Sequence, residues 1–431
     1  MSETQSVHNL ERSVGDPPSR TGWSLQGRGT YLAVFVVAVV FFLYCWSVQP
    51  GRPPLQDLTD DATAGWYGGS ADQINYAREA RALSQLELPG IYWDYDAWEP
   101  RPDRPADAEV TDYAYGLGYP VLGVPFIWLG LKGDPFVIPN SLMFGAAACL
   151  VFAIARRFLT DRGALLTTAA IVFATPFVNF IATPWNTTIT VIAALTIIYV
   201  GVSSDRSWPA TIAVAASVSL AFAARYVDVV WLGLLAAAAI GPRLRHFTRI
   251  VVVGAATLAV TSVLVLWSHQ QVFGSAFTTP LHYHFHDGKR GDDLSDYKLS
   301  RVPEHSIAVF ITSQQTNGDR SPTGHDPLLR DYFWLLAAPS GVYVLAKRER
   351  RLRALVNTVG FVLLAAAAVS IVASVFYLSY WSSGGDDIKN GNGRFFVAWF
   401  PVWGVLAAIG IADVYARLTG RHSVATSTES T

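Results

Sequence analysis

Long apolar runs separated by short polar links dominate this sequence. A helix needs roughly 20 apolar residues to cross the hydrocarbon core of a bilayer, and the runs are about that long. They predict an all-α integral membrane protein with about ten transmembrane helices. The expected spans are Tyr31–Val48, Phe136–Ala155, Ala164–Ile181, Thr187–Val202, Ala210–Ala224, Val227–Ile240, Ile250–Trp267, Leu328–Leu345, Leu355–Leu378 and Phe395–Tyr415.

One further apolar run, Tyr113–Leu131, is interrupted by glycine and proline, and the basic residues decide how it is placed. Cytoplasmic loops are enriched in Lys and Arg. If Tyr113–Leu131 does not cross the membrane, every basic cluster falls on the side of the N-terminus. We therefore predict a re-entrant or surface-lying helix in the outer interface, with both termini cytoplasmic. The clusters lie at 156–162, 243–249, 347–353 and 417–421.

The polar segments predict a simple domain organisation. Residues 1–29 and 422–431 are rich in Ser, Thr and charge without apolar periodicity, so we expect disordered cytoplasmic tails. Residues 30–421 form one polytopic membrane domain. Its two long outer loops are residues 49–112 and 269–327, and the first should carry surface-lying helices.

Composition supports a membrane protein and argues against some partners. Hydrophobic residues make up 51% of the chain and charged residues only 15%, where a soluble chain has about 25%. The formal net charge is −1, so nucleic acid is not an expected partner. The two cysteines, Cys45 and Cys149, lie in apolar runs and suggest no disulfide framework.

A short helix is predicted in the first outer loop, from Ser70 to about Leu88. Ser70 is a favourable N-cap, with Gln73 in capping-box position. Tyr76, Ala80 and Leu83 share an apolar face, so the helix could rest on the membrane surface. Asp72 falls in the first turn, where the helix dipole favours an ionised carboxylate. Asp72 either has only a local role at the start of the helix or takes part in catalysis.

The order of these parts resembles the GT-C glycosyltransferases, and within them the lipid A aminoarabinose transferases and protein O-mannosyltransferases. An outer-loop acid opens a helix of the form Asp-x-x-x-Tyr-x-x-x-Ala, and Tyr119-Pro120-Val121-Leu122 matches a Tyr-Pro-x-Leu segment. The chain departs from the family pattern at Gln73, where an acid is common, and in its single proline at the Pro-Pro site. Two later matches are the basic turn 155–163 and the segment 391–396 followed by Pro401, which resembles a Gly-x-Arg-Tyr/Phe helix start.

The resemblance implies transfer of a sugar from a polyprenyl-phosphate carrier to a lipid, glycan or protein acceptor, on the extracytoplasmic face of the plasma membrane. Such a reaction needs a general base, which would be Asp72, with Tyr76 beside it in the substrate site. It also needs positive charge on the departing phosphate. Arg225 and Arg394 lie at outer span ends beside aromatic residues, so they are candidates, although each could instead snorkel to lipid headgroups.

Other polar residues of the outer loops are further candidates. Asp94 and Asp96 lie among aromatic residues that could stack on a sugar or anchor the loop at the interface. His284 lies in an alternating run with His282 and His286, which could hold a metal, contact the acceptor or be solvated. We favour acceptor binding over a metal and expect no particular cofactor. The acids at 57, 60 and 61 are alternatives to Asp72 as the base.

The main alternative function is a transporter or flippase of lipid-linked saccharides, and a non-catalytic membrane scaffold is a second. A transporter should contain charged residues along its ion or substrate pathway, and the expected spans contain almost none. An enzyme should gather Asp72, Arg225 and Arg394 around one outward cavity. A transporter should instead have a polar cavity at mid-membrane depth.

Overall fold

The expected apolar segments coincide with helices in the computed structural model. It describes residues 25–48, 71–90, 93–94, 99–100, 116–131, 134–173, 186–203, 205–242, 244–278, 298–307, 333–351, 359–379 and 396–420, with a few single positions between them. The helices that match expected spans are α2 (Leu25–Ser47), α5 (Val137–Ala155), α6 (Asp161–Val172), α8 (Thr187–Ser203), α9 (Trp208–Ala224), α10 (Asp228–Ile240), α11 (Leu244–Phe273), α15 (Ala338–Arg351), α16 (Val359–Ser379) and α17 (Phe400–Leu418).

Five of the helices in the described part of the chain are long and apolar enough to cross a bilayer, namely α2, α5, α11, α16 and α17. The protein buries only 6% of the apolar window of α11, which is therefore a peripheral helix that presents its side chains to lipid. In α5 the buried share is 67%, so α5 belongs to the interior of the bundle. The chain is thus an all-α membrane protein, because only helices can satisfy their backbone groups in lipid without closing a barrel.

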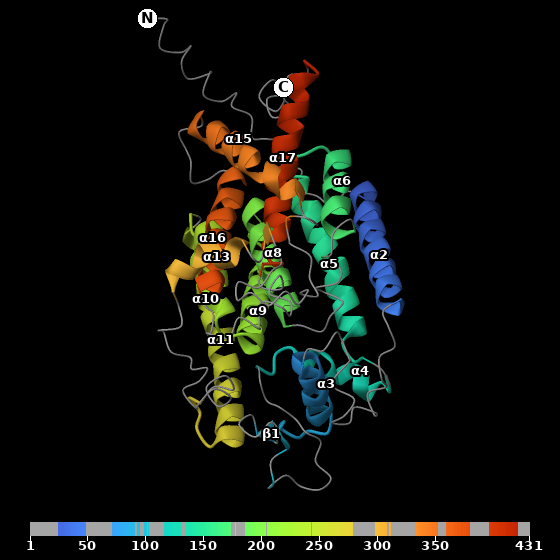
Figure 1. The fold of residues 1–431 in the computed structure, drawn as a ribbon, viewed down its shortest axis with the longest axis vertical. Coiled ribbons are helices and arrows are strands. Elements are labelled where there is room, and N and C mark those ends of the chain that lie inside the picture. Colours follow the sequence, from blue (N-terminus) through green and yellow to red (C-terminus); the bar gives the residue numbers. More distant parts are fainter. Residues whose placement is uncertain are drawn as a thin grey trace, which may run out of the picture.

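Basic residues gather at one end of the bundle. Arg156, which follows α5, lies over the ring of Tyr31 in α2 and pairs with Asp161 at 2.8 Å. Helix α9 begins at the same end as α11, because Arg249 lies 4.9 Å from the ring of Trp208. We call this the basic end. In Figure 1 the C-terminal end of α17 and helix α15 lie at this end, and α3 and α4 lie at the opposite end.

The expected boundaries differ from the observed ones at several helices. Helix α2 begins at Leu25, so residues 25–29, predicted to belong to a disordered tail, form its first turn instead. Helix α11 continues to Phe273, so His269 belongs to the helix rather than to the following loop. Helix α15 is preceded by a 3-10 helix, η7 (Phe333–Ala337), and includes basic residues as far as Arg351. Both helices extend past the apolar run because backbone hydrogen bonding continues into polar sequence at a membrane surface.

The segment Tyr113–Leu131 contains no helix long enough to cross a membrane within its described residues, 116–131. It contains a 3-10 helix, η3 (Pro120–Leu122), and a short helix, α4 (Val124–Trp128). Five helical residues span about 7.5 Å, well short of a hydrocarbon core of about 30 Å. The prediction that this segment does not cross agrees with its local structure.

Helix α3 (Ala71–Ser84) packs against η3 and α4, and we call residues 71–90 and 116–131 the α3 layer. Tyr76 of α3 makes an edge contact with Tyr119, whose hydroxyl lies 3.1 Å from Asn140 of α5. Trp128 of α4 donates to the Ser84 carbonyl at 2.7 Å. These contacts join the first outer loop to the bundle.

The interior position of α3 differs from a helix that merely rests on lipid. Every residue from Asn75 to Ala80 is buried, including Arg78 and Glu79. A two-stranded antiparallel ladder, β1 (Trp93–Asp94) with β2 (Glu99–Pro100), follows in the same loop. Protein therefore surrounds residues 75–80 of α3 on all faces.

Candidate functional site

An arginine and a buried acid face each other where α9 ends and α10 begins. Arg225 follows the last residue of α9, and Asp228 is the first residue of α10. The guanidinium Nη1 lies 3.5 Å from Asp228 Oδ2, and the carboxyl side chain of Asp228 is only 1% exposed. A buried charge requires a partner, so the Arg225–Asp228 pair explains how an acid is retained in this apolar bundle.

Two hydroxyl groups complete the surroundings of Asp228. Tyr377, in the last turn of α16, donates to Oδ1 at 2.6 Å. Thr190, in the first turn of α8, donates to Oδ2. The guanidinium of Arg225 also lies 5.4 Å from the centre of the Tyr377 ring. The Arg225–Asp228 pair therefore ties together the ends of α8, α9, α10 and α16.

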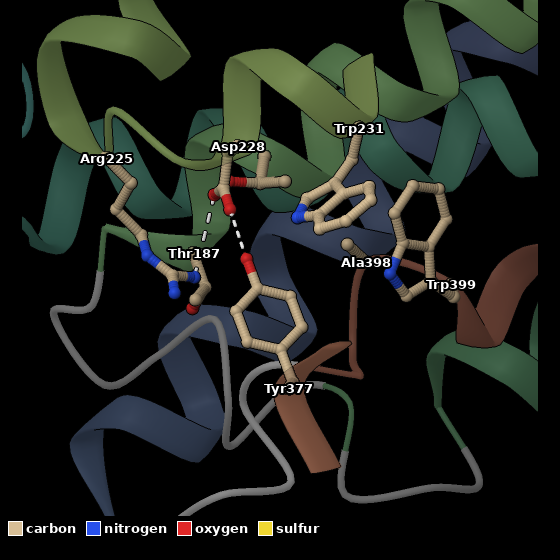
Figure 2. Close-up of a pocket in the computed structure, with 8 residues that line it drawn as sticks. Thr187, Arg225, Asp228, Trp231, Tyr377, Ala398 and Trp399 are labelled. Atoms are coloured by element: carbon tan, nitrogen blue, oxygen red, sulfur yellow. Dashed lines mark hydrogen bonds and ion pairs between the residues drawn. The ribbon is translucent and has the colours of Figure 1, made fainter. Parts of the chain in front are cut away.

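A small pocket opens beside this cluster (Figure 2). Aromatic side chains form much of its wall, and Trp399 comes from the residue just before α17. The pocket is lined by Thr187, Thr190, Arg225, Asp228, Trp231, Tyr377, Ala398 and Trp399. It therefore combines a cation, an acid and aromatic surface at one meeting point of helix ends.

Two polar atoms of the pocket residues lie in buried side chains. Oγ1 of Thr187, in a side chain that is 2% exposed, has no hydrogen-bond partner. Nε1 of Trp231, in a side chain that is 8% exposed, interacts with the Tyr377 hydroxyl. Figure 2 shows the nitrogen-bearing edge of Trp231 directed toward Tyr377 and the interior of the cluster. An unsatisfied buried polar group costs about 1–3 kcal/mol.

The α3 layer is anchored directly beside the pocket. The backbone N–H of Gly118 donates to the Ala223 carbonyl at 3.0 Å, and the Asn186 side chain donates to the Ala224 carbonyl at 3.1 Å. A Cβ atom on Gly118 would lie 2.6 Å from the backbone nitrogen of Ala224. Only glycine permits this approach, so the glycine that interrupts the apolar run serves close packing at the site.

The end of the second outer loop is anchored on the other side of the pocket. Helix α13 (Val302–Ile307) follows a 3-10 helix, η5 (Leu299–Arg301). His305 of α13 donates through Nδ1 to the Leu378 carbonyl at 2.7 Å, since a carbonyl can only accept. The Lys298 N–H donates to the Ser379 carbonyl at 3.0 Å. Both outer loops are thus fastened to helix ends that line the pocket.

The structure describes only some of the site residues that the sequence predicts. Arg225 lines the pocket, while Tyr76 is 2% exposed in the aromatic contact with Tyr119 described above. Asp72 lies in the first turn of α3 and Asp94 in β1, but their side chains are outside the described residues. Also outside the described residues are Asp96, His284 and Arg394.

The sequence interpretation missed most of the cluster around Arg225. Tyr377 follows Asp228 by 149 residues, and no local pattern links them. A signal was present for Asp228 itself, because an acid three residues after an arginine, in a short link between apolar runs, suggests a pair.

No group of three or more His, Cys, Asp and Glu side chains that could hold a metal occurs within the part of the chain that the structure describes. The histidine run at 282–286 lies outside that part.

Comparisons with known proteins relate the chain to others by fold alone. No protein-family model matches the sequence, and no curated protein matches it. Among solved structures, it is similar to the archaeal oligosaccharyltransferase AglB from Archaeoglobus fulgidus in complex with an inhibitory peptide and a dolichol-phosphate. That match has a TM-score of 0.51 at 12% identity, over 92% of this chain and 52% of that one.

The apo form of the Archaeoglobus fulgidus oligosaccharyltransferase is similar to the same degree, with a TM-score of 0.51 at 13% identity. The match covers 90% of this chain and 51% of that one. The chain therefore spans about half the length of these neighbours. The likeness concerns the fold alone: this chain is an all-α membrane protein whose fold is similar to that of these two archaeal structures.

Proposed function

We propose that the protein transfers a sugar from a polyprenyl-phosphate carrier to an acceptor on the outer face of the plasma membrane. The observation that carries the proposal is the pocket of Arg225 and Asp228, at the helix ends that face the α3 layer. This is the side that the distribution of basic clusters predicts to be outward. The archaeal neighbour is recorded with a dolichol-phosphate and a peptide, which agrees with a lipid-linked donor and a protein acceptor.

In the proposed reaction a carboxylate acts as the general base, and arginine side chains stabilise the leaving phosphate. Asp72, in the first turn of α3, takes the proton from the acceptor hydroxyl as that oxygen attacks the anomeric carbon. The bond from that carbon to the carrier phosphate breaks, and the phosphate leaves with its electron pair. Arg225 stabilises the charge on the leaving phosphate, and Arg394, four residues before Ala398 in the sequence, does the same.

The position of the pocket favours an enzyme over a transporter or flippase. The residues that line it come from helix ends: the first turns of α8 and α10, the last turn of α16, and the residues just before α17. A transport pathway should place charged residues near the middle of the membrane. Asp228 and Arg225 instead lie at the start of α10 and just after α9.

The proposal is tested with membranes that contain the protein and a panel of labelled polyprenyl-phosphate sugars. We expect label to reach an acceptor with one of the donors, and we expect this product to disappear in Asp72→Ala and Arg225→Ala. Asp161→Asn, at the basic end, is the matched control and should transfer normally. Movement of intact donor across vesicle membranes, with no transfer from any donor, would instead identify a flippase.

A further inference from the structure

Three large apolar side chains of the α3 layer are left without protein cover. Leu86 is 87% exposed, Trp128 is 63% exposed and Leu129 is 81% exposed. The indole Nε1 of Trp128 donates to the carbonyl of Ser84, two residues before Leu86, so the segments that carry the three side chains lie side by side. We call Leu86, Trp128 and Leu129 the apolar rim. A single exposed leucine is ordinary, but a group of large apolar side chains marks an interaction surface.

The backbone at Leu86 is unfavourable for a leucine. Helix α3 ends in a Schellman motif, in which the N–H groups of Leu86 and Glu87 donate to the carbonyls of Leu83 and Ala82, both at 3.0 Å. Leu86 takes the left-handed position of this motif with φ of 63°, and it is the only non-glycine residue with positive φ in the part of the chain that the structure describes. Glycine is usual at this position because it has no Cβ atom. A leucine that is both strained and exposed is poorly suited to water, so an apolar surrounding would account for it.

The apolar rim lies near the level at which the membrane-spanning helix α5 begins. A Cβ atom on Gly123, the N-cap of α4, would lie 3.1 Å from the ring of Phe136, which is the N-cap of α5. The 19 residues of α5 span about 28 Å, close to the hydrocarbon thickness of about 30 Å, so each end of α5 lies near a boundary of the hydrocarbon core. In Figure 1, α4 lies at this end of α5, below α2 and at the margin of the molecule.

The chemistry of the neighbouring residues also fits lipid. Residues 119–131 contain no charged side chain. Trp128 keeps its N–H bonded within the protein while its ring is exposed, as is common for tryptophan at a membrane interface. Exposed apolar side chains continue into the first turns of α5, at Ile138 and Leu142. Lipid is the surrounding of those two side chains, because α5 is long and apolar enough to cross the bilayer.

We propose that the apolar rim is a membrane-contact surface, in which Leu86, Trp128 and Leu129 insert into the leaflet that borders the α3 layer. The partner is the boundary between lipid headgroups and acyl chains, where an aromatic ring and leucine side chains are both stable. This contact holds the α3 layer at a fixed depth from its lipid side, as the Gly118 hydrogen bond to α9 does from the bundle side. A transferase and a transporter could both use such a surface, so it does not depend on the proposed function.

The test uses spin labels on the full-length protein, in a background whose two natural cysteines have been replaced. The protein is reconstituted in nanodiscs that hold one copy or two copies. Relaxation of each label is measured with oxygen, which concentrates in lipid, and with a nickel chelate, which stays in water. Leu86→Cys and Leu129→Cys report on the rim. Glu87→Cys is the matched control, because Glu87 is exposed in the same turn as Leu86, and Leu142→Cys on α5 is the lipid reference.

We expect labels at 86 and 129 to be relaxed more by oxygen than by nickel in nanodiscs with a single copy, and the label at 87 to show the reverse. The ratio of oxygen to nickel effects should be highest at 142, which lies deeper along α5. Melting temperatures close to that of the unlabelled protein would show that the variants are folded.

Three results would overturn the proposal. Labels at 86 and 129 that are as accessible to nickel as the label at 87, in both kinds of nanodisc, would place the rim in water, where an acceptor or another protein could bind it. Nickel access with one copy and protection with two copies would identify a second copy of this chain as the partner. Protection from both reagents with a single copy would show that the rim is covered by protein.

Discussion

Asp228 is the residue around which the candidate site is organised. Its carboxyl group receives hydrogen bonds from Tyr377 and Thr190 and pairs with Arg225, so it acts as a positioning residue for that arginine. The ion pair leaves the guanidinium of Arg225 at the pocket wall rather than free to extend to lipid headgroups. A residue held in this way loses little conformational entropy when a ligand binds.

We expect Asp228→Asn to lower both stability and transfer. The amide keeps the shape of the side chain but loses the ion pair and accepts through only one oxygen, which should cost about 2 kcal/mol. Melting temperature and initial transfer rate measure the two effects. Asp161→Asn is the control: Asp161 forms an exposed pair with Arg156, and such pairs contribute little. If Asp228→Asn kept wild-type stability and turnover, the result would contradict the role of Asp228 in the site.

Asp72→Asn should lower the transfer rate by roughly a factor of 100 to 10,000, while the protein still folds and inserts. An amide cannot take the proton of the acceptor hydroxyl. The position of Asp72 in the first turn of α3 favours the ionised form in the wild-type protein. Turnover with a labelled donor is the measurement, and the melting temperature shows that the variant is folded. A near-normal rate would move the role of base to Asp60 or Asp61.

Arg394→Lys should lose most of the transfer activity although it keeps the positive charge. A guanidinium presents a planar fork of donors that matches two phosphate oxygens, and an ammonium group does not. Arg394→Ala should in addition weaken binding of polyprenyl phosphate. These two measurements distinguish a phosphate contact from a headgroup anchor, because an anchor would tolerate lysine and leave carrier binding unchanged.

At the scale of elements, close helix packing depends on small residues. Helix α15 crosses α17 where Gly341 faces Leu406, and a Cβ atom on Gly341 would collide with the Leu406 carbonyl. Gly410 of α17 in turn faces Ser340 of α15. Small residues at helix contacts let backbones approach closely, which is the main source of helix association in lipid. The sequence shows the glycines, but their partners come from a different helix.

Gly341→Ala should therefore lower the melting temperature, although alanine is the better helix former. The backbone of α17 must shift to admit the methyl group. Gly254→Ala is the matched control, because no atom lies within 4 Å of its added Cβ in α11. This control should be neutral or stabilising by up to about 1 kcal/mol. Equal melting temperatures for the two variants would show that the α15–α17 contact tolerates a methyl group.

At the scale of the whole molecule, the basic end and the α3 layer lie at opposite ends of the bundle (Figure 1). The sidedness of these ends is a prediction from the positive-inside rule. It can be tested with single-cysteine variants in a protein whose Cys45 and Cys149 have been replaced. We expect a cysteine at position 245 to react only with a membrane-permeant reagent, and one at position 284 to react with an impermeant reagent from outside. The reverse pattern would invert the topology and place the pocket on the cytoplasmic side.

The sequence by itself determined the helices and the broken segment between them. Hydropathy locates spans well because each helix satisfies its own backbone in lipid, so the signal is local. Glycine and proline in Tyr113–Leu131 likewise act locally, and the described part of that segment contains only short helical turns. Among the candidate site residues, Arg225 was recognised because an arginine at an outer span end is itself a local signal.

The tertiary structure alone decided which side chains meet. Tyr377 and Thr190 reach Asp228 from positions 149 and 38 residues away, and their own surroundings in the sequence are ordinary apolar helix. Whether two helix ends converge depends on how the helices pack, which no periodicity within one helix encodes. Burial is likewise decided by packing. Tyr76, predicted at a substrate site, is 2% exposed and packs against Tyr119, while Trp231 lines the pocket although its sequence surroundings are those of any core aromatic residue.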